Sequence, residues 1–203
     1  SGGRYLDMRL HFEGARILGG NINEAEVDVL GFNAEQIEVI KRLRRIPGGM
    51  RVISGPTNQG KTTTLRVMLS RRMAETHYKL NCLLIEDPPE GPVTGARQIG
   101  VSAAQGDEAR ERIFSEIMRA SLRLDPDIVM LGEIRDFQSA TMAFRLALTG
   151  RQIYTTIHVY SALAIPKRIR DLGIEPYLIF DPYLLRGLMA QRLVKMICKH
   201  CRI

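Results

Sequence analysis

The stretch Gly55-Pro56-Thr57-Asn58-Gln59-Gly60-Lys61-Thr62 decides the fold of this chain. It fits the pattern G-x-x-x-x-G-K-[ST] at every required position, and it lies between an apolar segment and a helical pattern. Backbone N–H groups of such a loop surround a phosphate, and the helix N-terminus that follows adds positive potential. The alternative, a chance glycine-rich turn before a helix, does not explain why every required position is matched. The segment therefore predicts a nucleotide-binding loop.

In this loop Lys61 is expected to reach the β- and γ-phosphates, and the Thr62 hydroxyl is expected to bind Mg²⁺. The cofactors expected are thus ATP and Mg²⁺. The residues expected to bind the nucleotide are Gly55, Pro56, Thr57, Asn58, Gln59, Gly60, Lys61, Thr62 and Thr63.

Outward from the loop, apolar runs alternate with helical patterns. Candidate strands are 50–54, 81–85, 128–131 and 153–157, and candidate helices are 61–76, 107–122, 136–148, 161–172 and 177–192. Pro166 predicts a late start or a kink in one of these helices. The alternation predicts an α/β fold with a mostly parallel central sheet flanked by helices. Such sheets bind ligands beyond the carboxyl ends of their strands.

Residues 1–45 have a different texture. Short alternating segments over 4–12 and 25–30 predict strands of a small sheet. A helix is predicted over 34–45, with Asn33 as its cap and Gln36 at the capping-box spacing. We interpret 1–45 as the end of a small α+β N-terminal domain with its linker, and 46–203 as the nucleotide-binding domain.

Two predicted strands end in carboxylates. Glu133 follows the apolar run 128–131, which is typical of a Walker B acid that faces the metal. Glu86 ends the strand that follows the phosphate-loop helix, a suitable position for a general base. The alternative is that both are solvated acids at strand ends. Their position in one sheet with the phosphate loop favours a catalytic role.

His158 closes the next predicted strand. A lone histidine is more often structural, but at this edge of a nucleotide-binding sheet it is suited to sensing a γ-phosphate by a hydrogen bond. Thr149-Gly150-Arg151 precedes the same strand and is expected either to turn the chain or to contact a neighbouring subunit.

Composition narrows the function classes. The chain has 203 residues, 45% of them apolar and 25% charged, with a formal net charge of +7. These values indicate a globular protein suited to polyanions, and no apolar run is long enough to cross a membrane. We expect neither a signal peptide nor a disulfide framework, because an apolar h-region is missing and the three cysteines are an odd number.

Together these residues resemble the secretion ATPases, the motors of type II secretion, type IV pili and related conjugative pili. Four signatures match in order: Walker A at 55–64, the aspartate box at 85–90, Walker B at 132–136 and the histidine box at 149–158. Further likenesses are 124–127, before Walker B, and 190–194. The resemblance covers 46–203 well and 1–45 weakly.

The resemblance implies a RecA-like P-loop ATPase domain in a homo-hexamer at the cytoplasmic face of a bacterial inner membrane. Hydrolysis would power assembly of a pilus-like filament through a membrane platform protein, with peripheral membrane association through partners and no nucleic acid. It implies that Glu86 is the catalytic carboxylate, Glu133 the Walker B acid that also meets Mg²⁺, and His158 the phosphate sensor.

This sequence departs from the family pattern in several places. Asn58-Gln59 stand where Gly-Ser is usual, Arg151 stands where histidine is usual, and Pro89 stands where valine is common. In this family the arginines that complete the site come largely from the N-terminal domain. Only Arg4 and Arg9 are candidates for them here.

Cys198 and Cys201 form a C-x-x-C pair near the end of the sequence. The assembly and secretion branches resemble this, with a second pair further on, whereas retraction motors lack these cysteines. We interpret the pair as half of a Zn²⁺ site, with two free thiols as the alternative. Cys82 lies in an apolar strand and is expected in the core.

Three alternatives to an assembly motor remain at this point. A nucleic-acid translocase or helicase would suit the net charge of +7, but aromatic residues are only 6% of the chain and Trp is absent. A module that binds nucleotide without hydrolysing it would suit this stretch of sequence alone. A pilus retraction motor of the same superfamily is disfavoured by the terminal cysteines.

Overall fold

The computed structural model describes residues 16–17, 20–21, 30–87, 89–100 and 107–194. Its centre is a six-stranded sheet in the order β5-β4-β6-β7-β3-β8, in which every neighbouring pair is parallel. The strands are β3 (Gly49–Ser54), β4 (Cys82–Glu86), β5 (Ala96–Gly100), β6 (Ile128–Leu131), β7 (Gln152–Ile157) and β8 (Leu185–Ala190). A separate antiparallel pair consists of β1 (Arg16–Ile17) and β2 (Gly20–Asn21). The expected α/β fold with a parallel sheet is confirmed.

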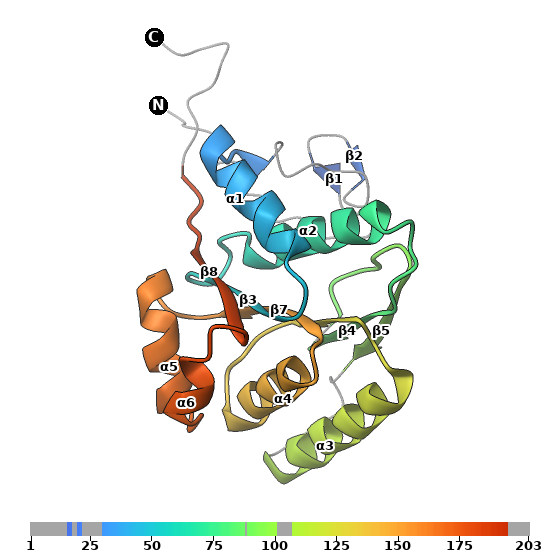
Figure 1. Cartoon of the computed structure of the whole chain (residues 1–203), viewed down its shortest axis with the longest axis vertical. Coiled ribbons are helices and arrows are strands. Elements are labelled where there is room, and N and C mark those ends of the chain that lie inside the picture. The colour runs from blue at the N-terminus through green and yellow to red at the C-terminus, as the bar shows by residue number, and fades with distance from the viewer. Residues whose placement is uncertain (1–15, 18–19, 22–29, 88, 101–106, 195–203) are drawn as a thin grey trace.

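Helices cover both faces of this sheet (Figure 1). One face carries α1 (Ala34–Arg45) and α2 (Lys61–Glu75), and the other carries α3 (Asp107–Leu124) and α4 (Phe137–Leu148). A short 3₁₀ turn, η2 (Ala162–Ala164), leads into α5 (Ile165–Asp171) and α6 (Pro176–Ile179), which lie near β8.

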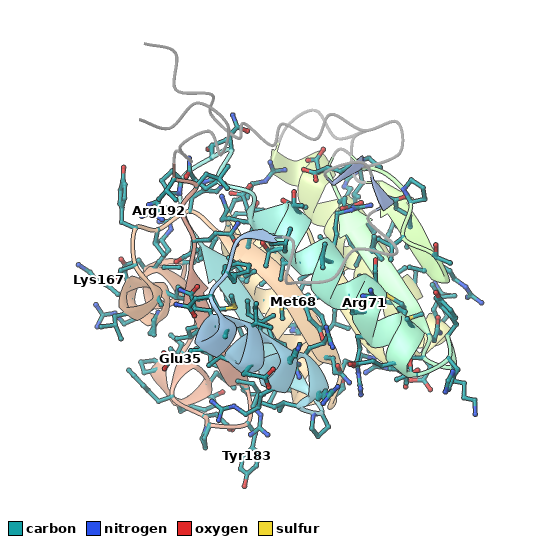
Figure 2. All side chains as sticks on the ribbon, turned by 90° about the horizontal axis from the view of Figure 1, so that it is seen from above. Glu35, Met68, Arg71, Lys167, Tyr183 and Arg192 are labelled. Carbon is teal, nitrogen blue, oxygen red and sulfur yellow. The ribbon has the colours of Figure 1, made fainter. Side chains whose placement is uncertain are left out.

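The four central strands are buried along their whole length, so each face of the sheet has its own core. Successive side chains of a strand point to opposite faces. Val52 accordingly packs into the cluster beneath α4, whereas Ile53 packs into the cluster beneath α2, which also contains Met68 (Figure 2). Burial on both faces explains why these strands read as continuous apolar runs.

Several expected elements are confirmed. The helix over 34–45 has the expected bounds, and its capping box between Asn33 and Gln36 is formed in both directions. The helix expected over 161–172 begins later, at Ile165, with Pro166 in its first turn, where a missing N–H costs nothing. The strands expected over 4–12 and 25–30 lie outside the described residues, except for Leu30.

The helix expected over 177–192 is wrong. Only α6 is helical there, and the chain then turns and forms β8 beside β3. Pro182 disfavours a helical conformation at the residue before it, and Gly187 lowers helix propensity further. Gly187 also permits a close approach, since a Cβ at that position would lie 2.9 Å from the Leu43 side chain of α1.

Strand β5 was not expected from the sequence. It is the outer strand beside β4, and three of its five residues are exposed. An edge strand of this kind has no apolar run that would reveal it in the sequence. It is a strand because it pairs with β4.

Candidate nucleotide-binding site

The carboxyl ends of the parallel strands bring residues from all four signatures to one edge of the sheet. β3 leads into the phosphate loop, β4 ends at Glu86, β6 leads to Glu133 and β7 leads to His158. These segments are scattered through the sequence, and the sheet order β4-β6-β7-β3 sets them side by side. This is the edge where open α/β sheets bind ligands.

The phosphate loop joins β3 to α2 through residues with unusual backbone angles. Gly55, Asn58 and Gly60 have φ values of 151°, 60° and 71°. A Cβ on Gly55 would lie 2.4 Å from the Gln191 carbonyl oxygen, so only glycine fits there. Gly60 caps α2 without a side-chain hydrogen bond, which leaves the N–H groups of the helix start for a ligand.

Lys61 begins α2 and is only 6% exposed. Its ammonium donates to the Pro56 carbonyl at 2.7 Å, and it forms no ion pair with a carboxylate in the part of the chain that the structure describes. Burial lowers the pKa of Lys61, Glu133 opposes this shift and Arg192 adds to it. The site therefore holds a buried cation with spare donors, which an anionic ligand would stabilise.

Glu133 and His158 lie together at this edge. Glu133 Oε1 is 3.4 Å from His158 Nε2, and both side chains are partly exposed. The loop that carries Glu133 is fixed to β7, because the Thr156 hydroxyl donates to the Gly132 carbonyl at 2.8 Å and Ile134 N donates to the Thr156 carbonyl at 2.9 Å. Walker B and the end of the histidine box thus form one polar cluster near Lys61.

Glu86 is in a different environment. It is 3% exposed, and Arg66 Nη1 of α2 donates to its Oε1 at 2.5 Å. Gln98 of β5 donates to its Oε2, so both carboxylate oxygens are engaged. Arg66 also donates to the Gly91 carbonyl. In this arrangement the carboxylate is held inside the protein rather than presented to solvent.

The rest of the aspartate box lies nearby. Asp87 Oδ2 accepts from Arg135 Nη2 at 2.6 Å, which joins the aspartate box to the Walker B segment. Burial raises the pKa of Glu90, and the negative charge of Glu86 raises it further. The two boxes therefore contact each other directly.

The histidine box is divided between the two ends of β7. Its first residues precede the strand, at the amino edge of the sheet, where the Thr149 hydroxyl donates to the Leu146 carbonyl at 2.7 Å. Arg151 pairs there with Asp125 at 3.0 Å. Only His158, beyond the carboxyl end, lies beside Glu133.

Arg66, Gln98 and Gln191 are partners of the site that sequence patterns did not identify. Arg66 is a charge inside a buried helical run, and a lone buried charge needs a partner, which is the signal that could have found it. Gln191 follows β8, and its side-chain amide contacts the phosphate loop. The stretch 190–194 resembles the family pattern, but no local pattern shows what it contacts.

The site fits a nucleotide with its metal. The buried Lys61 ammonium and the close-packed glycine loop suit phosphate oxygens. Thr62 at the helix start and Glu133 supply the oxygen ligands that Mg²⁺ prefers. The described residues contain no cluster of three or more His, Cys, Asp and Glu side chains, and a metal held largely by phosphate and water does not need one.

The cysteines fall into two groups. Cys198 and Cys201 lie outside the described residues. Cys82 is buried in β4, and this burial raises its pKa to about 12, which confirms the expected core position. No helix in the described part of the chain has the length and apolar character of a membrane span.

Comparisons with known proteins agree with this geometry. A family model described as "Type II/IV secretion system protein" matches residues 14–203. The type II secretion system protein HxcR of Pseudomonas aeruginosa is 37% identical over 99% of this chain and 42% of its own length. The type II secretion system ATPase E of Vibrio cholerae is 36% identical over 99% of this chain and 40% of its own length.

Among solved structures, the pilus retraction motor PilT with bound ADP has a TM-score of 0.64 at 27% identity. The match covers 83% of this chain and 48% of that one. The chain thus spans about two fifths of the curated relatives described above. The RecA-like fold and the four ordered signatures agree with these matches. The chain therefore belongs to the type II/IV secretion system protein family, which includes ATPases.

Proposed function

We propose that this chain is the ATP-hydrolysing part of a motor subunit that powers a type II secretion or type IV pilus-like filament. The observation that carries the proposal is the buried Lys61 ammonium, which bonds to one carbonyl at the start of α2 and has no carboxylate partner among the described residues. Such a cation is unfavourable unless an anion joins it. The two type II secretion relatives, each matched over 99% of this chain, support the choice of machine.

The roles of the residues follow from their positions. Residues 55–63 bind the phosphates, and Thr62 and Glu133 hold Mg²⁺, which when bound neutralises charge on the phosphate oxygens. His158, beside Glu133, donates a hydrogen bond to the terminal phosphate. Glu86 acts as the catalytic carboxylate, which requires that Arg66 or Gln98 release one of its oxygens so that it can orient the attacking water.

The wider assembly is part of the same proposal. The subunit would work in a homo-hexamer at the cytoplasmic face of a bacterial inner membrane, joined to the membrane through a platform protein. Residues 1–45 would end an N-terminal domain that supplies arginines to the site. Cys198 and Cys201 would form half of a Zn²⁺ site.

The proposal is tested by Mg²⁺-dependent ATP turnover with and without DNA, at an ionic strength of about 0.15 M. Lys61→Ala is the blank. Turnover that requires Lys61 and ignores DNA supports a secretion or pilus motor. Strong stimulation by DNA would indicate a translocase, and binding without turnover would indicate a nucleotide-binding module.

The two carboxylates are distinguished by their amide variants. Glu86→Gln is expected to suppress turnover while ATP binding persists, because the amide keeps the shape and loses the basic oxygen. Glu133→Gln is expected to weaken the Mg²⁺ dependence as well. Unchanged turnover in Glu86→Gln would end its catalytic assignment.

A retraction motor is the second candidate, favoured by the similarity to the PilT structure. The secretion relatives match more of the chain at higher identity, and the C-x-x-C pair at Cys198 argues against retraction. A second C-x-x-C pair in the same protein would favour assembly.

A further inference from the structure

The end of β8 lies directly against the phosphate loop. β8 pairs with β3 up to Ala190 opposite Ser54, and Gln191 N then donates to the Ser54 carbonyl at 2.8 Å. The Gln191 carbonyl oxygen is the atom that a Cβ on Gly55 would strike. The first residue of the loop and the residue after β8 are therefore packed backbone to backbone.

The Gln191 side chain joins the two halves of the phosphate-binding segment. Its Nε2 donates to the Gln59 carbonyl at 2.7 Å, and its Oε1 accepts from the Thr64 hydroxyl at 2.8 Å. The orientation of the Gln191 amide is fixed, because the Gln59 main-chain carbonyl can only accept a hydrogen bond and therefore must face the NH₂ group of Gln191. Gln191 is 8% exposed, so water competes little for these bonds.

A second bond runs in the opposite direction. Leu193 N donates to the Gln59 side-chain carbonyl Oε1 at 2.7 Å. Gln59 thus contacts the segment after β8 with both its main chain and its side chain. Arg192 lies between Gln191 and Leu193 in the sequence, and its guanidinium donates to the carbonyls of Gln191 and Tyr160.

The loop needs outside support of this kind. Asn58 has a φ of 60°, which costs free energy in a residue with a Cβ, and Gly60 caps α2 with no side chain. A loop that had to order itself on binding would lose affinity for the ligand. Bonds from a neighbouring strand hold its N–H groups in position beforehand.

We propose that Gln191 is a positioning residue for the phosphate loop, and that with Gln59 and Leu193 it forms a clamp that fixes the loop before nucleotide binds. This inference rests on the proposed function. Gln191 acts through the loop, because its side chain bonds to Gln59 and Thr64. The clamp also gives Gln59 a role that a serine at that position would be too short to fill in the same way.

The test is binding of a fluorescent ADP analogue with Mg²⁺ to the full chain and its variants, together with ATP turnover. Gln191→Met keeps the length of the side chain and removes both hydrogen bonds. We expect the dissociation constant to rise about 10- to 30-fold. Turnover at saturating ATP should change much less, since the reacting groups stay in place and a higher concentration of ligand reorders the loop.

Gln152→Met is the matched control. Gln152 is also a buried glutamine, at 7% exposure, but it begins β7 at the opposite edge of the sheet. Its variant is expected to bind the analogue with the affinity of the wild type. Equal weakening in both variants would indicate a general loss of packing and would overturn the proposal.

A second pair of variants tests the clamp without changing Gln191. Thr64→Val removes the hydroxyl and Thr64→Ser keeps it, so the first should weaken binding and the second should restore it. In the double variant with Gln191→Met, the losses should not add, because both changes break the same bond. Additive losses, or wild-type affinity in Gln191→Met, would overturn the proposal.

The measurements distinguish failure of the clamp from failure of the proposed function. If the wild type fails to bind the analogue, the proposed function fails and the clamp fails with it. If the wild type binds and turns over ATP while Gln191→Met does the same with unchanged affinity, only the clamp is wrong. If Gln191→Met does not fold, the Thr64 pair decides the question.

Discussion

A buried cation lies near each end of β3, and the two cations differ in how many hydrogen bonds they make to the protein. Near the amino end, Arg51 is 1% exposed and donates to the carbonyls of Leu43, Gly48 and Gly49, and also to that of Ile46. Beyond the carboxyl end, Lys61 is 6% exposed and donates to one carbonyl. Arg51 also lies 5.3 Å from the centre of the Tyr154 ring.

We interpret the difference as one between a structural charge and a charge available to a ligand. Nearly all the N–H groups of the Arg51 guanidinium donate to carbonyls at the end of α1 and in the turn that follows, where a helix end favours a cation. Lys61 keeps donors free and lowers stability by its burial. A buried polar group whose hydrogen bonds are all made within the protein contributes to the fold, whereas one with unused donors is a candidate for ligand binding.

The largest expected effect is at Lys61. Lys61→Ala should lower ATP turnover about 100- to 1,000-fold, since a charge-stabilising donor is lost. The melting temperature without nucleotide should stay the same or rise, because an unfavourable buried ammonium is removed. Calorimetry and a turnover assay on the same preparation measure both, and a large drop in melting temperature would contradict the contrast with Arg51.

Arg51 should show the reverse. Arg51→Met leaves several buried carbonyls without a donor and should cost about 3 kcal/mol of unfolding free energy. For a chain of this size the melting temperature would fall by roughly 6–12 °C. Nucleotide affinity measured below that temperature should match the wild type. If affinity fell together with stability, the two ends of β3 would not be independent.

The two ends of β7 allow a similar comparison within the histidine box, between His158 and Arg151. His158→Ala should lower turnover about 10- to 100-fold through the loss of one hydrogen bond to a charged group. Arg151→Ala should change stability by about 1 kcal/mol, because the Arg151 side chain is largely buried but its partner Asp125 is exposed to solvent, and should leave turnover unchanged in the isolated chain. Turnover that falls in Arg151→Ala only at high protein concentration would instead indicate a contact between subunits.

Glu75 gives the smallest effect. Partial burial raises its pKa, but the hydrogen bonds from Arg45 and Arg44 outweigh this and hold the pKa below its ordinary value. Its stabilisation is therefore fully present above the ordinary carboxylate pKa and is lost as the pH falls through the lower, folded-state value. Acid unfolding of Glu75→Gln should show a shallower pH dependence, by less than about 1 kcal/mol. An identical acid profile would show that the pair contributes nothing measurable.

In the alkaline range Lys61 gives a pH dependence of the same sign as Glu75, because its pKa is also lowered in the folded state. The folded protein therefore binds fewer protons than the unfolded chain in the window between the two pKa values of Lys61. Wild-type stability should rise with pH in that window. Lys61→Met should lack this rise in denaturant titrations, and a rise of equal size in the variant would assign the effect to other groups.

Sequence patterns predicted those parts of the molecule whose signals are local. The phosphate loop, the helix over 34–45 and the buried strands each carry their pattern within a dozen residues. The stretch 177–192 has apolar spacing compatible with either structure, and pairing of β8 with β3 decided it. The prediction therefore failed where a distant partner outweighed local preference.

The same distinction applies to the candidate site. The positions of Lys61, Glu133 and His158 follow from strand ends in a parallel sheet, and the structure brings them to one edge. The sequestration of Glu86 by Arg66 and Gln98 could not be read from a motif, because those partners come from α2 and β5. Gln191 contacts Gln59 across a separation of 132 residues, beyond any local pattern.

The position of β8 has a consequence for folding during translation. The phosphate loop leaves the ribosome well before the segment that fixes it, because Gln191 follows Gln59 by 132 residues. At translation rates of about 5–20 residues per second, the loop waits on the order of ten seconds for its clamp. A nascent chain that has already folded its helices and central strands would still lack this clamp, so the phosphate loop would be fixed only after β8 has been made.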